Sequence, residues 1–102
     1  MSVYSLHLTI RAQEDINQFW DYVPQDYWEP AERFIDSLLE RTQDLAGFPY
    51  MGPPDAELID VHALVVGRFK VFYTVNESTR TVMILRFWDT HRDLPIWEDL
   101  SD

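Results

Sequence analysis

Hydrophobic and polar positions change their period along the chain, and each period predicts an element. Residues 3–10 alternate strictly, with Tyr4, Leu6, Leu8 and Ile10 on one side, which is typical of a half-buried strand. From residue 11 the apolar positions recur at helical spacing until Pro24 ends the segment. A second helix contains Pro30, which suits a first turn, and carries one apolar stripe as far as Leu45.

Three more strands follow a long loop. Residues 46–60 contain three Pro and two Gly and show no period, and we interpret the aromatic residues of this loop as plugs for a core edge. Residues 61–66, 68–75 and 80–88 are separated by short turns and predict a meander. The order β-α-α-β-β-β predicts a single α+β domain over 1–102. Its two N-terminal helices pack on one face of a small twisted, mainly antiparallel sheet.

The face of the sheet that points away from the helices holds the candidate functional residues. In the third strand, alternation places Phe69, Val71, Tyr73 and Val75 on one side; in the fourth, the more apolar side is Met83, Leu85 and Phe87. We expect these sides to face the helices. The open face would then gather His7, Arg68, Lys70, Phe72, Arg86 and Trp88.

Composition narrows the class of protein. The 102 residues carry 18 acidic and 8 basic side chains, a net charge of −10, which disfavours broad affinity for nucleic acid. The charge is uneven, because residues 61–92 are net basic and keep a phosphate-directed role open. The absence of cysteine, of a membrane-spanning run and of a basic-then-apolar signal sequence leads us to expect a cytoplasmic protein with no membrane partner. Three scattered histidines have no ligand spacing, so we expect no metal and no cofactor.

Several short motifs occur in a familiar order. They are Ala12 with Asp15-Ile16, the run FWDY at 19–22, the helix from Ala31 to Leu38, FPYMGPPDAEL at 48–58, VGRFKVFYTV at 66–75 and FWDTHRDL at 87–94. Together they resemble the RelE/ParE superfamily of toxins from type II toxin–antitoxin modules, and within it the ParE-like branch of plasmid stabilisation proteins. The resemblance implies a small α+β toxin that is neutralised by a cognate antitoxin. It also implies one of two targets, since ParE-like members inhibit DNA gyrase and RelE-like members cleave mRNA on the ribosome.

Three hypotheses for function remain at this point. The first is a ParE-like toxin that inhibits gyrase by binding, with target or antitoxin contacts through Arg68, Lys70, Phe72, Arg86, Trp88, His91 and Arg92. The second is a ribosome-dependent endoribonuclease, in which Arg68 binds the scissile phosphate, Arg86 assists and His91 is the base or acid. Arg86 could instead pair with an acid from the helices. The third is a non-toxic binding module that kept the fold.

Charge decides the order of these hypotheses. A net charge of −10 weakens long-range attraction to the ribosome more than to a protein target such as gyrase, so the ParE-like hypothesis leads. His62 also stands where the family often has an arginine. Antitoxins of the family are typically acidic. An acidic toxin therefore requires an inverted charge pattern, or contact through the basic segment 61–92. The sequence gives no oligomeric state.

Overall fold

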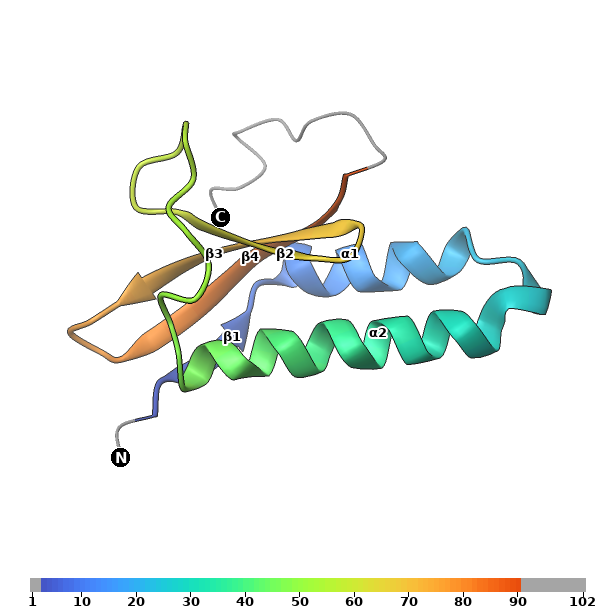
Figure 1. The fold of residues 1–102 in the computed structure, drawn as a ribbon, viewed down its shortest axis with the longest axis horizontal. Coiled ribbons are helices and arrows are strands. Elements are labelled where there is room, and N and C mark those ends of the chain that lie inside the picture. Colours follow the sequence, from blue (N-terminus) through green and yellow to red (C-terminus); the bar gives the residue numbers. More distant parts are fainter. Residues whose placement is uncertain (1–2, 91–102) are drawn as a thin grey trace.

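The fold is a pair of helices beneath a twisted sheet (Figure 1). The computed structural model describes residues 3–90. Its elements in chain order are β1 (Ser5–Leu8), α1 (Ile10–Asp21), the 3-10 turn η1 (Gln25–Tyr27), α2 (Trp28–Gln43), the 3-10 turn η2 (Asp44–Ala46), β2 (His62–Val66), β3 (Phe69–Asn76) and β4 (Thr81–Asp89). The predicted α+β class and the order β-α-α-β-β-β are confirmed.

Local sequence explains where the helices begin. The Thr9 hydroxyl accepts a hydrogen bond from the Ala12 amide at 3.1 Å and so caps α1. The same hydroxyl donates to the Leu85 carbonyl at 2.9 Å, which fixes the start of α1 against β4. Ile10, predicted to continue the first strand, is instead the first residue of α1 and is 73% exposed. Pro30 lies in the first turn of α2, as predicted.

The sheet has the order β1-β4-β3-β2. β4 is central: it pairs in parallel with β1 and antiparallel with β3, and β2 continues the antiparallel part. α1 and α2 run side by side along one face of this sheet, as expected from their apolar stripes (Figure 1). Neither they nor any other helix within residues 3–90 is long and apolar enough to cross a bilayer.

A bulge in β4 overturns one prediction about the core. The register passes from Phe72 opposite Arg86 to Tyr73 opposite Ile84, which leaves Leu85 as an extra residue. Strict alternation placed Met83, Leu85 and Phe87 together, but the main core contains Val82, Ile84 and Phe87. Leu85 packs in a second cluster, with Ala63, Phe72, Leu58, Val61 and Trp88. The inserted residue reverses the parity of the strand, so no single alternation describes β4.

The long loop after α2 is held to the edge of β2. The Pro53 carbonyl accepts from the Ala63 amide at 3.0 Å, and the buried Gly52 amide donates to the Tyr73 hydroxyl at 2.9 Å. A Cβ on Gly52 would lie 2.8 Å from that hydroxyl, so the close approach requires glycine. The prediction that loop aromatics plug a core edge is wrong for Phe48 and Tyr50, which are 70% and 55% exposed. Backbone contacts to β2 anchor the loop instead.

Candidate functional site

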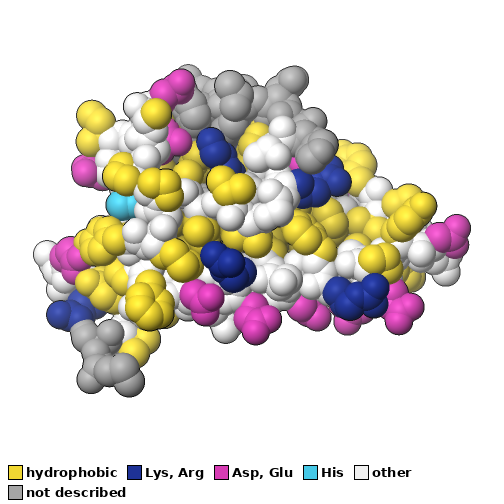
Figure 2. All heavy atoms as spheres, in the orientation of Figure 1, with side chains coloured by type: hydrophobic (Ala, Val, Ile, Leu, Met, Phe, Trp, Pro, Cys, Tyr) yellow, Lys and Arg dark blue, Asp and Glu magenta, His cyan; other side chains and the backbone are white. Residues whose placement is uncertain are grey.

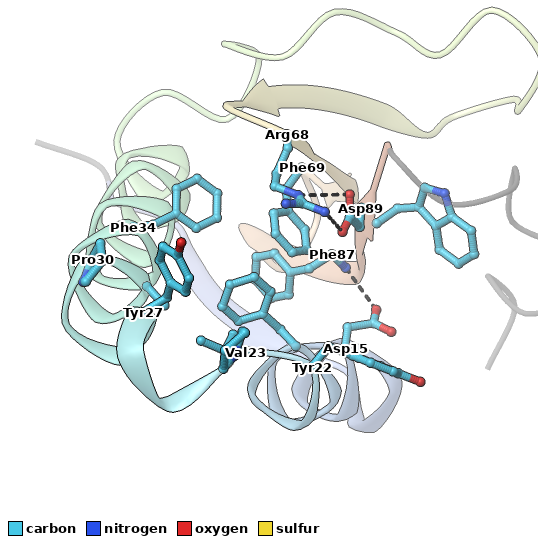
Figure 3. A pocket seen from close by; sticks show the side chains of 14 residues that line it. Asp15, Tyr22, Val23, Tyr27, Pro30, Phe34, Arg68, Phe69, Phe87 and Asp89 are labelled. Carbon is cyan, nitrogen blue, oxygen red and sulfur yellow. Dashed lines mark hydrogen bonds and ion pairs between the residues drawn. The ribbon is translucent and has the colours of Figure 1, made fainter.

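A pocket of about 690 Å³ opens between the helical hairpin and the ends of β3 and β4 (Figure 3). Seven of its fourteen lining residues are aromatic, among them Phe19, Tyr22, Tyr27, Phe34, Phe69 and Phe87. The rings of Phe19 and Phe34 lie 5.7 and 5.6 Å from that of Phe69, so helix and strand aromatics form one packed wall. Such a pocket can bury apolar groups of a partner.

Arg68 stands at the mouth of this pocket and is paired with Asp89. Its Nε donates to Oδ1 at 3.1 Å and its second terminal nitrogen donates to Oδ2 at 2.7 Å (Figure 3). The arginine is half-exposed, and the carboxylate is mostly covered. Gly67 makes this placement possible, since it has a φ of 57° and a Cβ there would lie 2.8 Å from the Phe34 ring. The sequence-predicted phosphate ligand is therefore already bound to a carboxylate.

Arg86 is paired in the same way, with Asp15 of α1. Two hydrogen bonds of 2.8 Å join the guanidinium to both carboxylate oxygens, and each side chain is only 9% exposed. Asp15 also accepts from the Phe87 amide at 3.0 Å, where β4 has passed the end of β1. The expectation that Arg86 lies on an open face is wrong, and the alternative of a helical acid partner is confirmed.

The outer face of the sheet is less open than its sequence pattern predicts. Phe72 is 2% exposed and packs with Trp88. The Lys70 ammonium lies 5.7 Å from the centre of the Phe72 ring, and the Arg86 guanidinium lies 5.3 Å from that of Trp88. Phe72 therefore fills a small core on this face and offers almost no surface to a partner. His91 and Arg92 lie outside the described residues.

The two described histidines are apart from this region. His7 is exposed on β1. His62 stacks on the Tyr73 ring, with centroids 5.3 Å apart, and its Nδ1 lies 2.9 Å from the Gly52 carbonyl oxygen. Residues 3–90 contain no group of three potential metal ligands. His62 thus has a structural role beneath the loop.

A cluster of titratable groups ties three segments together at the opposite end of the molecule. The Tyr4 hydroxyl donates to Glu77 at 2.5 Å, and the Tyr50 hydroxyl donates to the second carboxylate oxygen. These hydrogen bonds, from Tyr4 first and then from Tyr50, lower the pKa of Glu77. The bond to Glu77 raises the pKa of Tyr50 to about 12. The contacts join the first strand, the long loop and the β3–β4 turn.

Sequence reasoning missed the residues that give the pocket its character. Asp15 and Asp89, which hold the two arginines, were not proposed as site residues, nor were Tyr22 and Tyr27 of the hairpin. One available signal was the unusually aromatic and acidic run from residue 19 to 29, FWDYVPQDYWE, around a helix break. Its position beside Arg68 depends on tertiary packing that periodicity does not report.

Comparison with known proteins matches the chain to proteins of toxin–antitoxin systems. A family model described as the ParE toxin of type II toxin–antitoxin system, parDE, matches residues 6–94. A chromosomal ParDE toxin–antitoxin system from P. aeruginosa contains a similar chain (TM-score 0.73, 22% identity, 87% of this chain and 98% of that one). The RelBE2 toxin–antitoxin complex from Mycobacterium tuberculosis is similar too (0.66, 23%, 87% and 93%). So is an archaeal RelE–RelB complex from Pyrococcus horikoshii OT3 (0.51, 16%, 90% and 99%). No curated protein matches the chain.

Proposed function

Because the chain belongs to the family of ParE toxins of type II toxin–antitoxin systems, we propose that it acts by binding and inhibiting DNA gyrase, with no chemistry of its own. That it is the toxin component of such a module follows from the family. The choice of target is the proposal. It places the protein in the bacterial cytoplasm, where gyrase works.

The observation that carries this proposal is that Arg68 and Arg86 are each paired with a carboxylate. Cleavage of RNA through the 2′-hydroxyl needs cations directed at the phosphate as negative charge develops on it. Here both guanidiniums make bidentate hydrogen bonds to carboxylates, Asp89 and Asp15. An approaching phosphate would meet two nearly neutral ion pairs on a chain of net charge −10. Inhibition of gyrase by binding does not require a cation directed at a phosphate.

A cognate antitoxin is the second partner in the proposal. The similar solved structures are described as toxin–antitoxin complexes. The pocket of about 690 Å³ and the exposed aromatics beside it are suited to bury apolar side chains of such a partner. We expect the antitoxin to be encoded by an adjacent reading frame and to restore growth when co-expressed.

Gyrase supercoiling in vitro tests the proposal. Purified gyrase should lose supercoiling activity in the presence of the chain and recover it when the antitoxin is added. Induction without antitoxin should stop growth and raise the DNA-damage response. Normal supercoiling with an excess of folded chain would refute the proposal.

A parallel translation experiment tests the nuclease alternative. If mRNA is cut within translated codons, and a His91→Ala/Arg68→Ala double variant abolishes both cutting and toxicity, the protein is a ribosome-dependent endoribonuclease. An exposed position away from the pocket, Glu57→Gln, provides the control. The gyrase proposal instead expects no codon-dependent cleavage from either variant.

A further inference from the structure

The ion pair between Arg68 and Asp89 is held in place by the backbone around it (Figure 3). Phe69, the residue after the arginine, lies opposite Asp89 in the register of β3 and β4. The Arg68 carbonyl accepts two hydrogen bonds from the residue after the aspartate, one from the Thr90 amide and one from its hydroxyl, each 2.8 Å long. The fold therefore brings the carboxylate to the guanidinium, and the pair does not depend on two flexible side chains meeting in water.

This pair has little to contribute to the stability of the fold. Arg68 is 46% exposed, and partly exposed ion pairs are screened by water and salt. The pair between Arg86 and Asp15 differs, because both side chains are buried and the carboxylate also accepts from a backbone amide. The main effect of Asp89 is therefore on the charge that the mouth of the pocket presents to a ligand.

Asp89 neutralises a cation that is otherwise within reach of a ligand. The pair occupies Nε and one terminal nitrogen of Arg68, which are the donors of one edge of the guanidinium. A phosphate that approached this edge would have to displace the carboxylate, because bidentate binding of phosphate uses the same parallel donors. A phosphate on any other side would be attracted by the guanidinium and repelled by a carboxylate in direct contact with it.

We propose that Asp89 is a specificity-determining residue, which holds Arg68 as an ion pair and so excludes phosphodiester ligands from the mouth of the pocket. This inference deepens the proposed function and rests on it, since it gives a reason why the target is a protein and not RNA. Without the charge of Asp89, the same guanidinium is a ligand for phosphate. One carboxylate therefore separates two classes of target.

The net charge of −10 offers a different reason for the exclusion of nucleic acid. Figure 2 shows acidic side chains along the edge of the molecule that α2 forms, where Glu29, Glu32, Asp36 and Glu40 are exposed. Exposed charges more than about 8 Å from a ligand are largely screened at physiological salt, whereas a carboxylate in contact with the binding cation is not. The two explanations predict different results when one negative charge is removed at different positions.

Substitutions that remove one negative charge each test the proposal. Binding of a short, uniform, fluorescein-labelled single-stranded RNA to the full chain is measured by fluorescence anisotropy. Asp89→Asn should raise the affinity about three- to fivefold at low salt, as expected for one contact charge in water. The dependence of log affinity on log salt should steepen by about 0.7, the value for one more phosphate contact. Glu57→Gln, at an exposed position outside the pocket lining, makes the same change in net charge and should change the affinity less than about 1.5-fold. Equal gains in the two variants would overturn the proposal.

A double variant assigns the gain to Arg68. Asp89→Asn/Arg68→Gln should return to the affinity of the unmodified chain, and a gain that persists would overturn the proposal. Single-stranded DNA of the same length should show the same gain, because only phosphate is contacted; a gain confined to RNA would contradict this. Asp89→Ser removes the charge with a smaller side chain and gives a second reading if Asp89→Asn unfolds. No measurable binding by either charge-removing variant, with the fold checked by circular dichroism, would overturn the proposal.

These measurements contain no gyrase, so the two proposals can fail separately. Normal supercoiling in the presence of the chain would refute the gyrase proposal and leave the effect of Asp89 on RNA affinity as measured. Tight RNA binding by the unmodified chain, unchanged in Asp89→Asn, would refute the present one.

Discussion

Removing the Asp15 carboxylate should be among the most damaging single changes in α1. The substitution Asp15→Ala deletes both 2.8 Å hydrogen bonds to Arg86 and the 3.0 Å bond from the Phe87 amide. The Arg86 side chain, which is only 9% exposed, then keeps its positive charge without the Asp15 carboxylate. A helix residue thus controls the charge balance inside the sheet.

The magnitude follows from burial. Breaking a buried ion pair by removal of one partner costs about 3–5 kcal/mol, and loss of an acceptor for a buried amide adds about 1–3 kcal/mol. Because both side chains keep some contact with water, we expect a total of about 4 kcal/mol, the middle of the range for the pair. The free energy of unfolding of a domain of this size is about 5–15 kcal/mol. The change therefore removes a large part of the stability.

Urea unfolding followed by tryptophan fluorescence measures the effect. With a slope of about 1–2 kcal/mol/M, the midpoint should fall by about 2–4 M. Arg68→Ala is the control, because its partly exposed pair with Asp89 should contribute only about 0–1 kcal/mol. Replacing the whole pair, Asp15→Leu/Arg86→Met, should recover at least about 2 kcal/mol of the loss. A loss below about 1 kcal/mol for Asp15→Ala, or a double variant no better than the single one, would refute the reasoning.

Three other predictions address the ends and turns of the fold. Glu77→Gln should move the pKa of Tyr50 from about 12 down toward 10.0, as measured by absorbance titration, and a Tyr50 titration unchanged by the substitution would contradict this. Because the pKa of Tyr50 is raised in the folded chain, the stability from this bond is present below pH 10 and lost as pH rises through about 12. Gly67→Ala should cost about 1–3 kcal/mol in urea, since φ is 57° and the Cβ would lie 2.8 Å from the Phe34 ring; no loss would show that the turn adopts another conformation. Thr9→Ala should cost about 1 kcal/mol through loss of the α1 cap, and Thr9→Ser should restore most of it.

The elements of the fold could be predicted because their causes are local. Pro30 lies in the first turn of α2, and the stripe through Ile35 and Leu38 turns α2 onto the sheet, both within a few residues of sequence. The bulge at Leu85 could not be predicted in this way. It occurs where β4 passes the end of β1 and continues beside α1, a meeting of segments more than 70 residues apart.

The same distinction between local and long-range causes applies to the candidate site. Arg68 and Arg86 were found from the hairpin motif and from strand parity, but their partners were not. Asp89 reaches Arg68 only through the register of β3 and β4, and Asp15 reaches Arg86 only because α1 lies along the far edge of β4. Residue type suggests a cation; whether it is available to a ligand depends on long-range contacts.

The position of β4 has a consequence for biosynthesis. β4 is the last described strand in the chain, yet it lies between β1 and β3, and Ser5 pairs with Thr81. A nascent chain that lacks it holds no partner for β1 and no surface to cover much of the apolar stripe of α1. Contacts between residues so distant in sequence form late and carry a high cost of loop closure. The sheet can therefore close only after β4 (Thr81–Asp89) has left the ribosome, and a chain that is truncated or stalled before residue 81 lacks the strand that pairs with both β1 and β3.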